Sequence, residues 1–118
     1  MLIIRNEQMK SFGAAARERF VADTGEELSR RLHLETDAAV ALVRAGVAKA
    51  SAHGIDLRED VVFMCELMHR FGPEFEEQPE MRWTRPILEH EELPGWGKMK
   101  LIRARMASSP GLQDERRA

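Results

Sequence analysis

Apolar residues recur at three- and four-residue steps in several separate segments of this chain, and glycine or proline closes most of these segments. This spacing places apolar side chains along one side of an α-helix, whereas a half-buried strand would need strict alternation. Glycine adopts the left-handed backbone that leaves a helix, and proline prevents the helix from continuing. The sequence therefore predicts an all-α fold.

The pattern divides the chain into four or five helices. Gly25 is the expected place for a bend or break in the first of them, because glycine inside a helix costs about 1 kcal/mol relative to alanine. The expected segments are residues 6–33 with Asn6 as N-cap, a second helix from Thr36 to a stop at Gly54, a third capped by Asp56 and stopped by Gly72 and Pro73, a short helix at Trp83–Leu88, and a last one at about residues 97–106.

We expect these helices to form one small bundle. The first three would pack antiparallel, and the later short helices would cap them. Residues 1–106 form a single domain in this prediction, and residues 107–118, "ASSPGLQDERRA", form a disordered tail because they have little to bury. The first helix, about 40 Å long if unbroken, would overhang its partners and leave apolar surface for a homodimer or a cargo protein to cover.

Composition limits the classes of partner. The 118 residues are 43% hydrophobic, enough for one core, and 18 basic residues nearly balance 20 acidic ones for a net charge of -2. Such a balance gives no general attraction to nucleic acid or to an anionic membrane. The single cysteine, Cys65, excludes an intramolecular disulfide, and no stretch approaches eighteen apolar residues. We therefore expect a cytoplasmic protein that binds neither membrane nor nucleic acid.

Cys65 and His69 are four residues apart and would share one side of a helix, as two metal ligands could. Two further ligands would have to come from His33, His53, His90 or the glutamates, none of which has a diagnostic spacing. No serine elbow, phosphate-binding glycine loop or HExxH motif is visible either. We therefore predict no catalytic residue, no metal and no cofactor, with a small metal-dependent enzyme or regulator as the alternative from another class.

The stretch "MHRFGPEFEEQPEMRW" begins as a helix and continues as an acidic loop. Gly72 and Pro73 predict an elbow there, with Phe75 tucked beneath it. The loop carries four glutamates that either keep it solvated or dock on a basic partner: Glu74, Glu76, Glu77 and Glu80.

The last predicted helix carries a basic strip and follows a loop that contains Trp96. Tryptophan between glycines and a proline is well suited to a contact surface, since it is a frequent interface hot spot. The strip lacks interleaved aromatic residues that could stack on bases, so pairing with acidic residues within the protein or across a dimer is expected, and nucleic-acid binding through the strip is the alternative. Its members are Lys98, Lys100, Arg103 and Arg105.

Several of these stretches together resemble a family of short, uncharacterised helical proteins of proteobacteria encoded among type VI secretion cargo genes. They are "IRNEQM", Phe20, "HGIDLREDV", "LMHRFGPEFEEQPEMRW" and "ILEHEELP", and the resemblance covers about residues 3–106. It implies an accessory role beside a secreted effector and supplies no catalytic residues.

The leading hypothesis is a non-enzymatic protein-binding module, an adaptor or chaperone for a secreted effector or spike component. The alternative is an immunity protein that neutralises a toxin. The adaptor would use exposed parts of the first helix with the acidic elbow as a rim. The immunity protein would use the glutamates between Glu74 and Glu80 to mimic a substrate or to block a basic active site. The expected partner-binding residues are Phe12, Phe20, Glu74, Glu76, Glu77, Glu80 and Trp96.

Overall fold

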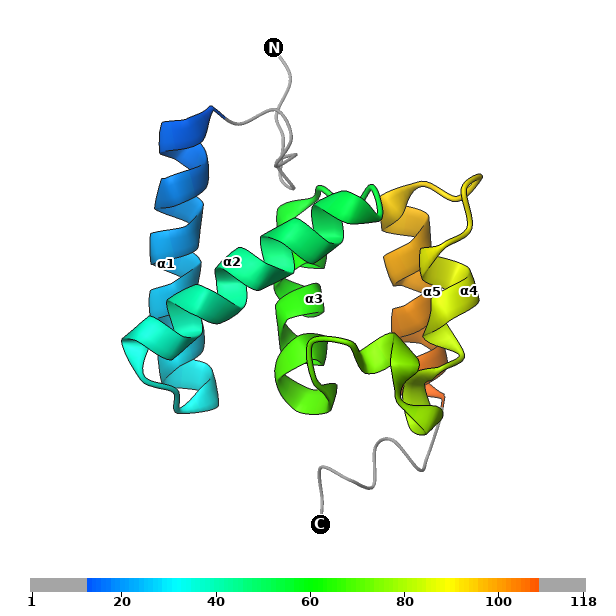
Figure 1. Ribbon diagram of the computed structural model, residues 1–118. Coiled ribbons are helices and arrows are strands. Elements are labelled where there is room, and N and C mark those ends of the chain that lie inside the picture. Colours follow the sequence, from blue (N-terminus) through cyan, green and yellow to red (C-terminus); the bar gives the residue numbers. More distant parts are fainter. Residues whose placement is uncertain (1–12, 109–118) are drawn as a thin grey trace.

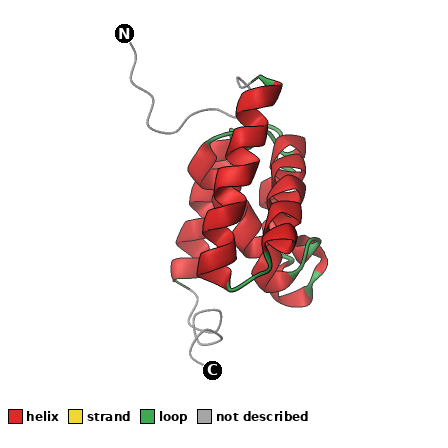
Figure 2. Ribbon diagram, turned by 90° about the vertical axis from the view of Figure 1, so that its left-hand side faces the viewer, coloured by secondary structure: helices red, strands yellow, loops and turns green. Residues whose placement is uncertain are grey.

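The computed structural model describes residues 13–108, and this part of the chain is an all-α bundle without strands (Figures 1 and 2). The predicted fold class is therefore confirmed. The helices are α1 (Ala14–Leu32), α2 (Thr36–Ala52), α3 (Arg58–Phe71), α4 (Thr84–Leu88) and α5 (Gly95–Ala107), with two short 3₁₀ turns, η2 (Phe75–Glu77) and η3 (Pro79–Met81), between α3 and α4.

The helices run alternately down and up the molecule, as Figure 1 shows. α1 descends on one side, α2 climbs diagonally across both α1 and α3, and α3 descends through the middle. The elbow and α4 then return on the far side, where α5 descends beside α4. Helix α2 thus joins the α1 side of the molecule to its α5 side.

α1 is continuous through Gly25, so the expected break is wrong. A Cβ atom at Gly25 would lie 2.8 Å from Cγ2 of Val40, so the glycine is needed where α1 and α2 touch rather than for a bend. The predicted start at residue 6 is also wrong for a continuous helix, because Gly13 has extended backbone (φ -73°, ψ 174°). α1 has 19 residues and α2 has 17, so the expected overhang is absent from the described residues.

α2 and α3 are also in close contact. A Cβ atom at Gly46 would overlap with Sγ of buried Cys65, so only glycine allows the two helices to approach this closely. Gly54, with φ 75°, turns the chain after α2 as predicted. At the next helix the prediction fails in detail, because the N-cap is Leu57 and not Asp56.

The elbow has the predicted construction. α3 ends at Phe71, and Gly72 follows with φ 104° before Pro73. Phe75 is completely buried, and so is Met81 at the end of η3. Pro86 lies within the first turn of α4, where its missing N–H costs little.

The core extends through all of these elements, from Phe20 and Leu28 of α1 to Met99 and Ile102 of α5. Its large side chains also include Met64, Leu67, Phe75, Met81 and Leu88. No helix within residues 13–108 combines the length and apolar character needed to cross a bilayer. Three of the predictions fall outside the described residues: the cap at Asn6, the side chain of Phe12 and most of the tail.

Candidate functional site

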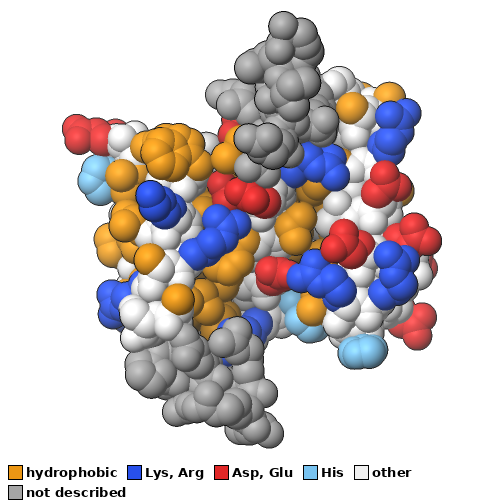
Figure 3. All heavy atoms as spheres, turned by 180° about the vertical axis from the view of Figure 1, so that it is seen from behind, with side chains coloured by type: hydrophobic (Ala, Val, Ile, Leu, Met, Phe, Trp, Pro, Cys, Tyr) orange, Lys and Arg blue, Asp and Glu red, His pale blue; other side chains and the backbone are white. Residues whose placement is uncertain are grey.

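The outer face of α5 carries two exposed large apolar side chains. Trp96 is 58% exposed and Leu101 is 46% exposed, while Met99 and Ile102 on the opposite side of the helix are completely buried. The exposed arc between Trp96 and Leu101 also includes Lys100 and Ala104. In Figure 3, hydrophobic and basic side chains are interspersed over the α5 side of the molecule, whereas opposite charges alternate over the α1 side. We call Trp96, Lys100, Leu101, Ala104 and Arg105 the α5 outer face.

The orientation of α5 is set by its first turn. A Cβ atom at Gly95 would overlap with the carbonyl oxygen of Gly54, so this glycine lets α5 lie directly on the loop between α2 and α3. Lys98, one turn later, is buried, and its Nζ donates to the carbonyl oxygens of Leu88 at 2.7 Å and His53 at 2.9 Å. With Gly95 and Lys98 facing inward, the geometry of the helix directs Trp96 outward.

The middle of α5 is tied to α3. Arg103 donates to Oδ1 of Asp60 at 2.7 Å and to the carbonyl oxygen of Glu59 at 3.2 Å, and its guanidinium lies 4.6 Å from the ring centre of Phe63. Burial raises the pKa of Asp60, and the hydrogen bond from Arg103 opposes that rise. Helix α5 is therefore held by polar contacts on both the loop side and the α3 side.

The far end of α5 packs on Trp83. The guanidinium of Arg105 lies 4.8 Å from the ring centre of Trp83, whose Nε1 donates to the carbonyl oxygen of Glu80 at 3.1 Å. Trp83 is half-buried against the core, as the sequence predicted for it. The two tryptophans therefore differ: Trp83 is a packing residue, and Trp96 is presented to solvent.

The acidic elbow is partly satisfied within the chain. Nζ of Lys49 lies 2.9 Å from both carboxylate oxygens of Glu76, and the two side chains are only 12% and 13% exposed. Burial alone would raise the pKa of Glu76, but the hydrogen bond and the charge of Lys49, a backbone hydrogen bond and the charge of His53 together outweigh it, and the pKa is lowered. Glu77 contacts Arg85 at 3.5 Å, while Glu74 and Glu80 are exposed. Glu76 is thus a structural residue rather than part of a docking surface.

The residues expected on α1 do not form an exposed surface. Phe20 is 2% exposed and belongs to the core, with the guanidinium of Arg58 at 4.9 Å from its ring centre. Its assignment to a partner-binding surface is therefore wrong for this structure, because the ring is buried in the hydrophobic core. Phe12 lies outside the described residues.

Cys65 and His69 do not form a common site. Cys65 is completely buried at the contact with Gly46, and burial raises the pKa of its thiol to about 12, whereas His69 is exposed. Such a thiol is neither an accessible ligand nor an activated nucleophile. Among residues 13–108 no group of three or more His, Cys, Asp or Glu side chains is arranged to hold a metal ion.

Comparison with known proteins adds no relative: no family model, no curated protein and no solved structure matches this chain. The geometry of the described residues is thus the basis for a functional proposal.

Three features of the site were missed by sequence reasoning. The buried lysine, Lys98, was grouped with exposed basic residues, and the pairs Asp60–Arg103 and Lys49–Glu76 join residues 43 and 27 positions apart. A local signal existed for Lys98 alone, because it lies three residues after Gly95 and next to Met99, on the inward side of the helix.

Proposed function

We propose that this protein is a non-enzymatic protein-binding module that receives an amphipathic segment of a partner protein on the α5 outer face. The segment would place apolar side chains against Trp96 and Leu101, and carboxylates against Lys100 and Arg105. The observation that carries the proposal is the 58% exposure of Trp96 on a helix that Gly95 and Lys98 hold in place.

A fixed tryptophan is an efficient binding group. Tryptophan is enriched among the residues whose truncation costs most at interfaces, because it buries a large area with few rotatable bonds. The helix that carries Trp96 is already ordered by contacts with Leu88, His53 and Asp60, so a partner would not need to order it on binding.

Charge selects the kind of partner. Lys100 and Arg105 are exposed beside Leu101, and the outer face between Trp96 and Arg105 carries no acidic residue. A partner with carboxylates flanking its apolar residues would complement this face, whereas a basic partner would be repelled. In the setting implied by the family resemblance, such a partner would be a secreted effector or a spike component, and this protein would act as its adaptor or chaperone.

Co-expression with the products of neighbouring genes tests the proposal. The wild-type protein should co-elute with one of them, and Trp96→Ser combined with Leu101→Ser should abolish that co-elution. Arg19→Ser with Arg30→Ser, both exposed on α1, serves as the matched control and should leave it unchanged. A doubled molar mass in light scattering that depends on Trp96, with no co-eluting product, would contradict the proposal. It would mean that the α5 outer face binds a second copy of this chain instead of another protein.

The exposed glutamates of the elbow favour a second candidate, toxin neutralisation. Glu74, Glu77 and Glu80 lie on one loop and are exposed, although Glu77 also contacts Arg85. Neutralisation predicts that the protein rescues growth when a neighbouring toxin gene is expressed, and that Glu74→Gln with Glu80→Gln removes the rescue. An adaptor would instead raise the solubility of its cargo and leave the cargo's activity intact.

A further inference from the structure

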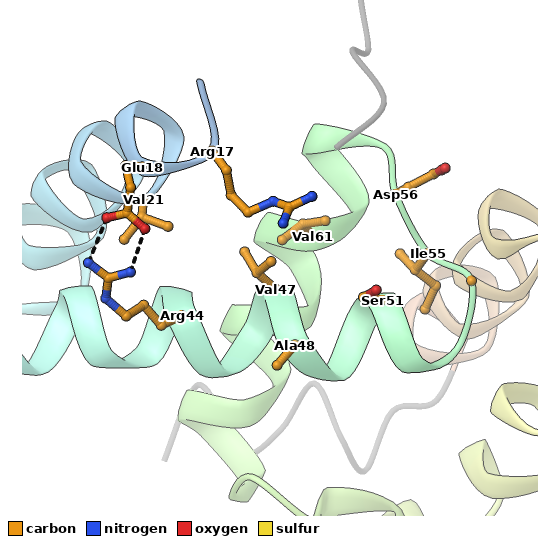
Figure 4. A pocket seen from close by; sticks show the side chains of 11 residues that line it. Arg17, Glu18, Val21, Arg44, Val47, Ala48, Ser51, Ile55, Asp56 and Val61 are labelled. Atoms are coloured by element: carbon orange, nitrogen blue, oxygen red, sulfur yellow. Dashed lines mark hydrogen bonds and ion pairs between the residues drawn. The ribbon is translucent and has the colours of Figure 1, made fainter. Parts of the chain in front are cut away.

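A pocket of about 410 Å³ opens between α1, α2 and the start of α3. This volume is within the range of about 300–1,000 Å³ that ligand pockets occupy in proteins. Figure 4 shows its lining side chains, which come from three helices and the loop after α2. The lining residues are Arg17, Glu18, Val21, Arg44, Val47, Ala48, Ser51, Gly54, Ile55, Asp56 and Val61.

The pocket has an apolar interior and a charged rim. Val47 and Val61 face each other across it, and the side chain of Arg17 extends over them from α1. On one edge Arg44 makes two 2.8 Å hydrogen bonds with Glu18, and Asp56 lies at the opposite edge. An occupant should therefore bring aliphatic side chains for the interior and charges of both signs for the rim.

We propose that the first residues of this chain occupy the pocket, with Leu2, Ile3 and Ile4 in its apolar interior. These residues lie outside the described part of the chain. They are joined to it at Gly13, and the pocket begins only four residues later, at Arg17. The inference concerns a different face from the α5 outer face and does not depend on the proposed function.

Chain length permits this arrangement. Arg17 and Val21 lie four and eight residues beyond Gly13, which corresponds to about 6–12 Å along the helix. The eight residues from Arg5 to Phe12 can span up to about 27 Å when extended. The chain can therefore turn back at Gly13 and bring Ile4 to the far edge of the pocket.

The chemistry of the segment matches the pocket on two counts. Leu2, Ile3 and Ile4 form a short aliphatic run of high strand propensity, and the pocket edge after Asp56 continues into Leu57, whose backbone is extended (φ -81°, ψ 141°). The residues that follow the aliphatic run carry both signs of charge, Arg5, Glu7 and Lys10, as the rim does.

Methyl NMR on the full chain tests the occupant. Nuclear Overhauser contacts should join the methyl groups of Ile3 or Ile4 to those of Val21, Val47 or Val61. Substituting Ile3→Ser and Ile4→Ser together should shift the resonances of the three valines, while those of Val43, which is buried on α2 but does not line the pocket, change less. Contacts of Ile3 and Ile4 with other parts of the protein only, or no contacts at all, would overturn the proposal and leave the pocket to a partner or a small molecule.

Filling the pocket provides an independent readout. Ser51→Phe should compete with the segment for the apolar interior, so trypsin should cleave after Arg5 and Lys10 about ten-fold faster than in the wild type. Ala45→Phe is the matched control, because residue 45 is exposed on the same helix but does not line the pocket. Equal cleavage rates in these two variants would contradict the proposal.

Discussion

Arg103 on α5 donates a 2.7 Å hydrogen bond to Asp60 in the first turn of α3, and the side chain of Asp60 is only 2% exposed. The pair joins the helix that presents the α5 outer face to the centre of the bundle. A buried carboxylate without its cation is strongly destabilising, so the loss of this contact should be costly.

Replacing Arg103 should destabilise the protein. We expect Arg103→Ala to lower the free energy of unfolding by about 3 kcal/mol, because it leaves the carboxylate of Asp60 buried and unpaired. Arg105→Ala is the control and should cost less than about 1 kcal/mol, since Arg105 is exposed and its guanidinium lies over the Trp83 ring rather than against a buried carboxylate. Chemical denaturation at pH 7 measures both values, and equal losses would contradict the prediction.

The same substitution should have a defined pH dependence. Burial raises the pKa of Asp60, and without Arg103 that pKa should rise further. A carboxyl group whose pKa is raised on folding favours the folded state while protonated, and this benefit is lost as the pH rises through the folded pKa. The difference in the free energy of unfolding between wild type and Arg103→Ala should therefore be largest at neutral pH and shrink in acid. A difference that grows in acid would refute this prediction.

The Lys49–Glu76 pair should stabilise the elbow with its own pH profile. The pKa of Glu76 is lowered from its ordinary value of 4.5, so its contribution is present above that pH and is lost as the pH falls through the folded pKa. Lys49→Met should cost about 2 kcal/mol at pH 7 and progressively less below pH 4.5. Arg30→Met, which removes an exposed 3.9 Å pair with Glu26, should cost under about 1 kcal/mol at either pH.

The contact between Gly46 and Cys65 should make two substitutions non-additive. Gly46→Ala should destabilise the protein by about 1–3 kcal/mol, because the new methyl group overlaps with Sγ of Cys65. Adding Cys65→Ala removes that sulfur and should recover part of the loss. Thermal unfolding of the two single variants and the double variant forms the cycle, and simple additivity would show that the overlap is not the cause.

Lys98 should hold α5 through its two carbonyl contacts. Lys98→Met keeps the length of the side chain but leaves the carbonyl oxygens of His53 and Leu88 without this donor, at a cost of about 3 kcal/mol. Burial lowers the pKa of His53, and the positive charges of Lys49 and Lys98 lower it further. NMR titration should therefore find a higher pKa for His53 in Lys98→Met, provided α5 remains in place; an unchanged pKa would argue against this electrostatic link.

Features that depend on residues close together in the sequence could be predicted, and features that depend on contacts between distant residues could not. The predictions that depended on neighbouring residues are confirmed. They are the helix stops at Gly54 and Gly72, the burial of Phe75 and the first-turn position of Pro86. The prediction for Gly25 was wrong because glycine is required there by the close approach of Val40, which lies on another helix. A glycine that permits close packing has the same local appearance as one that breaks a helix.

The candidate site was less predictable for the same reason. The expectation that Trp96 would be available for contact agrees with its exposure, because the flanking Pro94, Gly95 and Gly97 were visible in the sequence. The burial of Phe20 and Asp60 depends on which helices meet, and no local pattern encodes that. The first helix was therefore expected to provide the partner surface that we propose on α5 instead.

Titration calorimetry between this protein and the purified partner found by co-elution would decide whether the α5 outer face binds a partner. We predict that Trp96→Ala weakens binding at least about thirty-fold, in line with hot-spot truncations of 2 kcal/mol or more, while leaving the unfolding midpoint unchanged. Arg19→Ala on α1 should leave the affinity intact. Equal affinity of the wild type and Trp96→Ala for a partner that binds both would contradict the proposal.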